Sequence, residues 1–330
     1  MTFQFVKAIF LFVILAASLL VAQEPLKQHV DNPGQTPMDQ KATGHNLEAV
    51  PEMIEQANPT GQAVVTGNGI NYHGGPVLKG NPVPFYVIWY GNWNGTGSNT
   101  QATVGLVEHF IKTLGNTPYE KIATTYGDNT GNVSGNVTLA GAIFDTGSQG
   151  TSLTNTKLTS IVSRSFSNGL PTDANGVYII LTSSNVSEQG FCTQFCGFHT
   201  HQTLNGKDIK WAFVGNPDRC PSGCEIQTTG PNSPATGVGG ADGMINVIAH
   251  EQFETITDPD LNAWFDSSGQ EDSDKCNFNF GTTSTCGTGS ACTPAGVSAR
   301  AKFNVVFGGN DWMLQQQWEN AQGGKCVLHL

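Results

Sequence analysis

The order of strand-like and helix-like segments between residues 85 and 256 constrains the fold of this chain more than any other feature. Segments typical of strands lie at 85–90, 136–144, 176–181 and 210–214. Segments with apolar residues at helical spacing lie at 104–114, 154–166 and 243–256. Strands that alternate with helices are typical of an α/β layer. We therefore expect an α/β fold, with α+β as the alternative, built on a mixed β-sheet with flanking helices.

The N-terminal part of the chain differs from this region. One lysine, an apolar run from Ala8 to Val21 and the small residue Ala22 predict a secretory signal peptide over residues 1–22, with a retained signal anchor as the alternative. Residues 23–67 are polar and contain scattered prolines, which predicts a flexible spacer or a pro-segment. We expect residues 68–330 to form a single domain.

Charge excludes one class of partner. The chain has 15 Lys and Arg residues against 26 Asp and Glu residues, a formal net charge of −11. Such a balance gives no electrostatic attraction to phosphate backbones, so we expect no nucleic-acid partner. With the signal removed, no other stretch is apolar enough to cross a membrane, and we expect a secreted protein of the extracellular space, periplasm or cell wall. The sequence does not indicate an oligomeric state.

All eight cysteines lie after residue 190. They are Cys192, Cys196, Cys220, Cys224, Cys276, Cys286, Cys292 and Cys326. An even number of cysteines in an exported chain predicts disulfides. We expect the pairs Cys192–Cys196, Cys220–Cys224, Cys286–Cys292 and Cys276–Cys326, in a disulfide-rich, irregular region over residues 260–330. The alternative for the first four cysteines is a structural zinc site.

The residues best suited to catalysis or metal binding lie within residues 250–274, which hold eight of the chain's 26 acidic residues. His250-Glu251-Gln-Phe-Glu254 lies on a predicted helix, 243–258, and residues four apart share a helix face. His250 and Glu254 could therefore bind one ion while Glu251 acts as general base, as in the zincin helix, which has a second histidine where this chain has Glu254. The expected cofactor is zinc in a zincin-like domain, with calcium as the alternative because carboxylates dominate.

Further ligands have to come from outside this helical turn. The acidic candidates are Asp258, Asp260, Asp266, Glu271 and Asp274. His199 and His201 are secondary candidates, because on a strand they would share a face and could reach the acidic helix as a ligand or as a stabiliser of a developing oxyanion. Two ordinary alternatives are an acidic, solvated helix end and a rigid loop with a buried histidine. The density of acids favours a bound cation.

Six motifs occur in order along residues 71–330: Tyr72-His-Gly-Gly-Pro-Val77, Val87-Ile-Trp-Tyr-Gly-Asn-Trp93, Gly190-Phe-Cys-x-x-x-Cys-Gly197, Val214-Gly-Asn216, Cys220-Pro-x-x-Cys224 and Ala241-Asp-Gly-Met244. Together they resemble the EXORDIUM, or phosphate-induced protein, family. The resemblance implies an extracellular, cell-wall-associated protein linked to growth and to brassinosteroid or sugar responses, with no established catalytic activity. It also implies a His-Glu-x-x-Glu helix that leads into Asn-Pro; this chain has Asp258 before Pro259 and adds a long polar stretch before residue 68.

Two functions of different classes follow. The first is a secreted metal-dependent hydrolase, a zincin-like peptidase with His250 and Glu254 as ligands, Glu251 as general base and a peptide substrate. The second is a non-catalytic extracellular or cell-wall-associated protein, with a cell-wall component as partner, in which zinc or calcium only stabilises the fold.

Overall fold

The computed structural model describes residues 69–233, 239–286, 300–321 and 324–330, together with the main chain of three short strands nearer the N-terminus. Those strands are β1 (Gln28–Val30), β2 (Ile54–Ala57) and β3 (Ala63–Thr66). The predicted signal peptide and most of the predicted spacer lie outside the described residues.

A six-stranded mixed sheet forms the centre of the fold. Its order is β1, β12 (Gly197–Leu204), β13 (Lys207–Val214), β10 (Val177–Thr182), β5 (Val83–Tyr90) and β8 (Val137–Asp145). The four strands from β13 to β8 are parallel, whereas β12 runs antiparallel to β13 and β1 antiparallel to β12. The predicted α/β class with a mixed sheet is confirmed. β10 is buried along its whole length, as expected for a central parallel strand.

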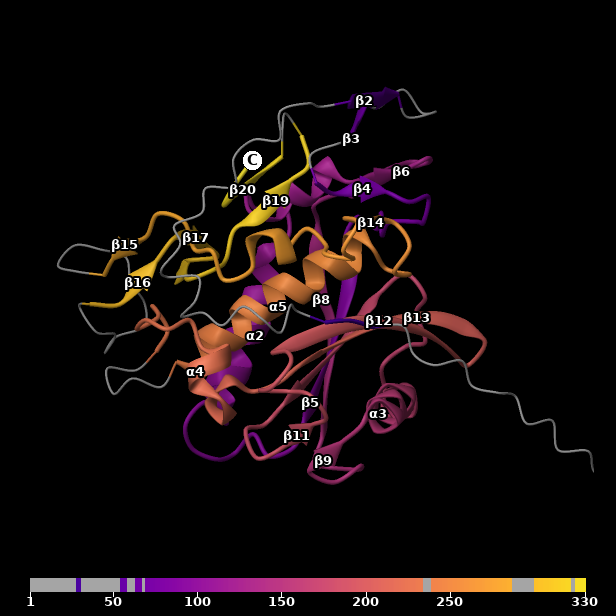
Figure 1. Cartoon of the computed structure of the whole chain (residues 1–330). Helices are drawn as coiled ribbons and strands as arrows, with labels where there is room; N and C mark the ends of the chain where they lie inside the picture. Colours follow the sequence, from indigo (N-terminus) through magenta and orange to yellow (C-terminus); the bar gives the residue numbers. More distant parts are fainter. Residues whose placement is uncertain are drawn as a thin grey trace, which may run out of the picture.

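Helices cover both faces of this sheet. α2 (Gln101–Leu114) and α5 (Gly240–Thr257) pack together on one side, and α3 (Asn155–Ser167) lies on the other (Figure 1). α2 begins at the N-cap Thr100, whose side chain accepts a hydrogen bond from the Thr103 amide. Every residue of α5 is buried. The polar side chains of α5 therefore have to be satisfied by protein groups or by a bound ion. Among the described residues, no helix is long and apolar enough to span a membrane.

Short elements make up the remainder of the described chain. The two-stranded pairs are β4 (Asn71–Tyr72) with β14 (Trp264–Phe265), β6 (Gly127–Asp128) with β7 (Gly131–Asn132), β9 (Ser152–Leu153) with β11 (Ser187–Glu188), β15 (Ser284–Thr285) with β16 (Lys302–Phe303), β17 (Val305–Phe307) with β18 (Asn310–Trp312), β19 (Gln317–Glu319) with β20 (Lys325–Val327), and β2 with β3. Helical turns are η1 (Glu120–Thr125), η2 (Pro217–Arg219), α4 (Pro221–Cys224) and η3 (Asp274–Cys276). The described residues after 260 form only short elements, as the predicted irregular C-terminal region requires.

The disulfides correct two of the predicted pairs. The structure has Cys192–Cys220 and Cys196–Cys224, so the predicted local pairs Cys192–Cys196 and Cys220–Cys224 are wrong. Cys220 is the N-cap of α4 and Cys224 its last residue, so the two lie one helical turn apart, and each bonds to a different one of Cys192 and Cys196. These four cysteines therefore form no zinc site.

The predicted pair Cys276–Cys326 is confirmed. It links η3 to β20 and so attaches the last strand to the segment that follows α5. Cys286 is also disulfide-bonded, and its predicted partner Cys292 lies outside the described residues.

Replacing both Cys276 and Cys326 with serine should lower the free energy of unfolding by about 2–4 kcal/mol, because the bridge restricts a long loop of the unfolded chain. The two cysteines are 50 residues apart in sequence. Urea unfolding of the double variant, compared with the unreduced natural chain, measures this loss. A double variant as stable as the natural chain would contradict it.

Candidate metal centre

Helix α5 carries the core of the predicted site. The predicted pair is present, because His250 and Glu254 lie one turn apart and His250 Nε2 is 3.0 Å from Glu254 Oε1. After α5 the chain turns back, so that the Asp274 amide donates to Glu254 Oε1 at 3.2 Å. Asp274 Oδ1 then lies 3.6 Å from His250 Nε2. Helical spacing and one returning loop bring these three side chains together.

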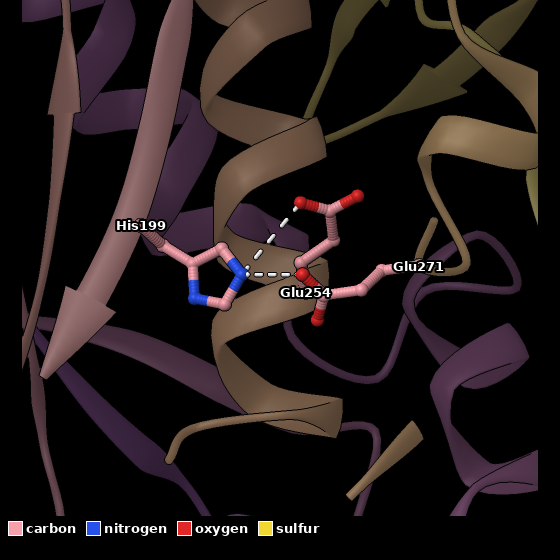
Figure 2. Close-up of side chains that lie close together, drawn as sticks. All are labelled: His199, Glu254 and Glu271. Carbon is pink, nitrogen blue, oxygen red and sulfur yellow. Dashed lines mark hydrogen bonds and ion pairs between the residues drawn. The ribbon is translucent and has the colours of Figure 1, made fainter. Parts of the chain in front are cut away.

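Strand β12 supplies a second histidine. Figure 2 shows His199 reaching from β12 toward Glu254 of α5 and Glu271 of the returning loop. His199 Nε2 is 2.9 Å from Glu271 Oε2 and 3.8 Å from Glu254 Oε2. The two carboxylate oxygens of Glu254 therefore face different histidines.

These contacts define two donor groups that share one carboxylate. Donor group 1 consists of His199, Glu254 and Glu271, and donor group 2 of His250, Glu254 and Asp274. Within each group the possible ligand atoms lie within 4.8 Å of one another, and every member is buried. The structure thus brings together five of the predicted candidates, and it does so from three separate segments of the chain.

Gln315 fixes the orientation of the His250 ring. Its amide oxygen accepts a hydrogen bond from the Phe278 amide at 3.2 Å, and its amide nitrogen donates to the Ser273 carbonyl at 3.0 Å. The same oxygen lies 3.3 Å from His250 Nδ1, so Nδ1 must be the donor there. In neutral His250, Nε2 is then an acceptor that faces the Glu254 carboxylate. Two acceptors 3.0 Å apart require a shared proton or cation.

Burial makes a balancing proton or cation at this site still more necessary. It raises the pKa of Glu271 well above its usual range, and the negative charges of Glu254 and neighbouring acids raise it further. Burial and the charge of Glu254 also raise the pKa of Asp272, against hydrogen bonds from Thr257 and Ser273 that lower it. Each ionised carboxylate in such a place costs several kcal/mol unless an opposite charge accompanies it. Protons or a divalent cation can supply that charge.

The other acidic candidates have different partners. Asp258 caps the turn after α5 by accepting from the Asn262 and Ala263 amides, each at 2.6 Å. Asp260 pairs with Lys210 at 3.2 Å. Asp266 pairs with Lys275 at 2.8 Å. The first is thus engaged in a turn and the other two in ion pairs.

His201 follows His199 by two residues, but its ring meets a more exposed environment. His201 Nδ1 lies 2.9 Å from Asp208 Oδ1, and these two residues form a third group of possible donors with Asp260. The amine of Lys210 contacts both of these aspartates. Since a lysine already supplies positive charge there, this third group needs a cation less than donor groups 1 and 2.

Glu251, the candidate general base, belongs to neither donor group. Its carboxylate lies against Gly197 of β12: a methyl group added at Gly197 would come within 2.6 Å of Glu251 Oε1. Gly197 and His199 share the face of β12 that packs against α5, because side chains alternate along a strand. Glu251 therefore lies between helix and strand, beside the two donor groups.

Comparison with known proteins identifies the family. The family model for the phosphate-induced protein 1 conserved region matches residues 70–328. Protein EXORDIUM-like 5 of Arabidopsis thaliana is 34% identical over 221 residues, which cover 59% of this chain and 59% of that protein. Protein EXORDIUM-like 3 of the same plant is 31% identical over 282 residues, 76% of this chain and 80% of that protein. The chain belongs to the EXORDIUM, or phosphate-induced protein, family.

The resemblance predicted from six motifs is thereby confirmed. Protein EXORDIUM of Arabidopsis thaliana is also similar, with 28% identity over 229 residues. The family model begins at residue 70, so the strands β1, β2 and β3 lie outside the matched region of this EXORDIUM-family chain. No solved structure matches significantly.

Two buried residues that contact α5 carry no signal in the sequence. Gln315 orients His250 from 65 residues away, and a glutamine in a polar C-terminal stretch carries no recognisable signal. Glu120 of η1 accepts a hydrogen bond from Gln252 of α5 at 3.0 Å, and burial raises its pKa to about 8. A lone acid after a tyrosine gives no hint that it is buried.

Replacing Gly197 with alanine should lower the free energy of unfolding by about 1–3 kcal/mol, because the added carbon would overpack the contact between β12 and α5. It would lie 2.7 Å from Val247 Cγ1 and 2.9 Å from the Phe213 carbonyl oxygen, which is part of the main chain and cannot rotate away. Chemical unfolding measures the loss.

Gly105→Ala is the matched control. Gly105 is an exposed residue of α2 with no atom within 4 Å of the added carbon, so alanine there should raise stability by about 0.5–1 kcal/mol. A Gly197→Ala variant as stable as the natural chain would contradict the close contact of β12 with α5 at this residue.

Proposed function

We propose that this EXORDIUM-family chain holds a zinc ion at donor groups 1 and 2 and uses it to hydrolyse peptide bonds. Two imidazoles and three carboxylates supply the mixed nitrogen and oxygen ligands that zinc accepts. Calcium prefers an all-oxygen shell, so the two histidines favour zinc over the calcium alternative. Glu254 would take part in holding the ion, because one of its oxygens faces His250 and the other faces His199.

One observation carries the metal assignment: the acceptor nitrogen of His250 faces the Glu254 carboxylate at 3.0 Å. A histidine that ligates a metal commonly donates its other ring N–H to a carbonyl or carboxylate, which fixes its tautomer. The Gln315 amide oxygen occupies that role for His250 Nδ1. A bound cation would join the two acceptors and would offset the charge of the surrounding acids.

The division of roles among neighbouring side chains supports hydrolysis. A bound zinc ion would supply Lewis acidity and would make water a better nucleophile at neutral pH. His250, Glu254, His199, Glu271 and Asp274 are the residues that would hold it. Glu251 follows His250 on α5 and its carboxylate lies beside Gly197 of β12, so in this proposal it would accept the proton of the attacking water and pass it to the leaving amine.

A second candidate is a purely structural ion, and the burial of the donors favours it. His199 and Glu254 are each 0% exposed, and the donors come from α5, β12 and the returning loop. A cation there would fasten three segments together without turnover. In that case a cell-wall component, rather than a peptide, would be the partner.

We also infer that the protein is secreted. Three described disulfides support export, because disulfides form and persist in oxidising compartments. The apolar segment at residues 8–21 supports the same inference.

We predict that the purified secreted protein contains stoichiometric zinc and that His199→Ala and His250→Ala each lower this content strongly, because each variant removes a ligand atom. Elemental mass spectrometry after extensive dialysis measures the content. His109→Ala is the matched control, since His109 contacts the Gly308 carbonyl and lies in neither donor group. A chelator should also lower the melting temperature of the natural chain. Metal content that is unchanged in His250→Ala, or a natural chain without metal, would contradict the site.

We predict that Glu251→Gln retains its zinc and loses peptide hydrolysis by at least about 100-fold, because the general base is gone while the ligands remain. The assay compares initial rates on an unstructured protein substrate. Glu225→Gln, a change at an acid outside both donor groups, should keep the natural rate. Full activity of Glu251→Gln would refute the catalytic role, and a zinc-loaded natural chain that cleaves no peptide would leave the structural ion as the function of the site.

A further inference from the structure

The strand that carries His199 lies near one edge of the sheet, and the strand beyond it comes from an unexpected part of the chain. β1 pairs antiparallel with β12, and the register places His29 opposite His199. β1 belongs to residues 23–67, which the sequence predicts to be a spacer or pro-segment, and it lies outside the region matched by the family model. Among the described residues of the family domain, β12 is therefore the last strand on this side of the sheet.

The main chain of His199 points toward this edge. The Cys196 carbonyl accepts a hydrogen bond from the Gly215 amide at 3.2 Å, so the main-chain groups of Cys196 face β13. Main-chain groups alternate between the two sides of a strand. Those of Phe198 consequently face β13, and those of His199 face away from it, toward β1. One residue thus offers its ring to donor group 1 and its amide and carbonyl to the outer edge.

Within the part of the chain that the structure describes, β1 covers only part of this edge. It pairs with three of the eight residues of β12. An edge strand presents unpaired amides and carbonyls that can add another extended chain, and β-strand addition is a common way of binding peptides. An extended peptide on β12 would pass directly beside His199, with its main chain held in one register.

We propose that the outer edge of β12 is a binding site for an extended peptide, and that Gln28–Val30 occupies this site in the intact chain as an intramolecular competitor. The proposal assigns β1 the role of a blocking strand on the edge of β12. That the incoming peptide is the substrate rests on the proposed function, whereas its binding rests on β12 alone.

Two variants at one position test the blocking role in the full chain. Proline at residue 29 has no amide hydrogen and cannot complete the pair with His199, whereas alanine keeps it. The probe is a fluorescent synthetic peptide with the sequence of residues 24–34, and anisotropy reports its binding. The proposal expects His29→Pro to bind the probe at least tenfold more tightly than His29→Ala and the natural chain, because the competing strand is released. Equal binding by all three would overturn it.

A cleavable chain tests the edge directly. A protease site placed between Gly44 and His45 allows the segment that contains β1 to be cut and washed away. Exchange of the His199 amide hydrogen should then accelerate at least tenfold and slow again when the peptide is added, while the Phe198 amide, bonded to β13, stays protected as internal control. An unchanged His199 amide, or a cut chain that does not bind the peptide, would overturn the proposal.

Both experiments are repeated after chelation and with Glu251→Gln. If the peptide binds while no zinc is found, the proposed function fails and the binding edge stands. If zinc is present and the peptide does not bind, the edge fails and the metal centre stands.

Discussion

The negative charge buried along α5 must be balanced, and much of the surrounding structure depends on how that is done. His250 presents an acceptor nitrogen to Glu254 because Gln315 holds its other nitrogen as a donor. A single proton could join the two, but the carboxyl groups of Glu271 and Asp274 lie in the same place, where burial and the neighbouring acids raise the pKa of Glu271 and so favour further protons or a cation. One divalent cation would satisfy these groups together. The helix, β12 and the returning loop all converge on the Glu254 carboxylate.

The covalent framework reinforces that convergence. The Cys196–Cys224 bridge lies three residues before His199, and the Cys276–Cys326 bridge lies two residues after Asp274. Each disulfide therefore fixes a segment that delivers a donor to α5. Gly197 contributes in another way, because the absence of a side chain lets β12 approach Glu251 closely. The donors are thus positioned by main-chain proximity and cross-links more than by long side chains.

The sequence predicted the features that local periodicity encodes. Helical spacing brought His250 and Glu254 together correctly, and apolar runs located β5, β10 and α5. β12 was not predicted, because its polar sequence, with two histidines and a glutamine, becomes a strand only through pairing with β13. Sequence spacing also did not show which acidic residues lie near the histidines. Asp260 is close to His250 in sequence but pairs with Lys210. Glu271 and Asp274 are further away in sequence, and a loop brings them back to α5. The disulfide pairing required the relative position of two loops, which no local pattern contains.

X-ray diffraction from crystals of the purified protein, recorded on both sides of the zinc absorption edge, tests the central claim most directly. The account predicts an anomalous peak between the histidines, within about 2.0–2.2 Å of His250 Nε2 and of a Glu254 oxygen. An ordered centre with no such peak, in which His250 and Glu254 remain in direct contact, would show that a proton balances the charge and would contradict the metal centre.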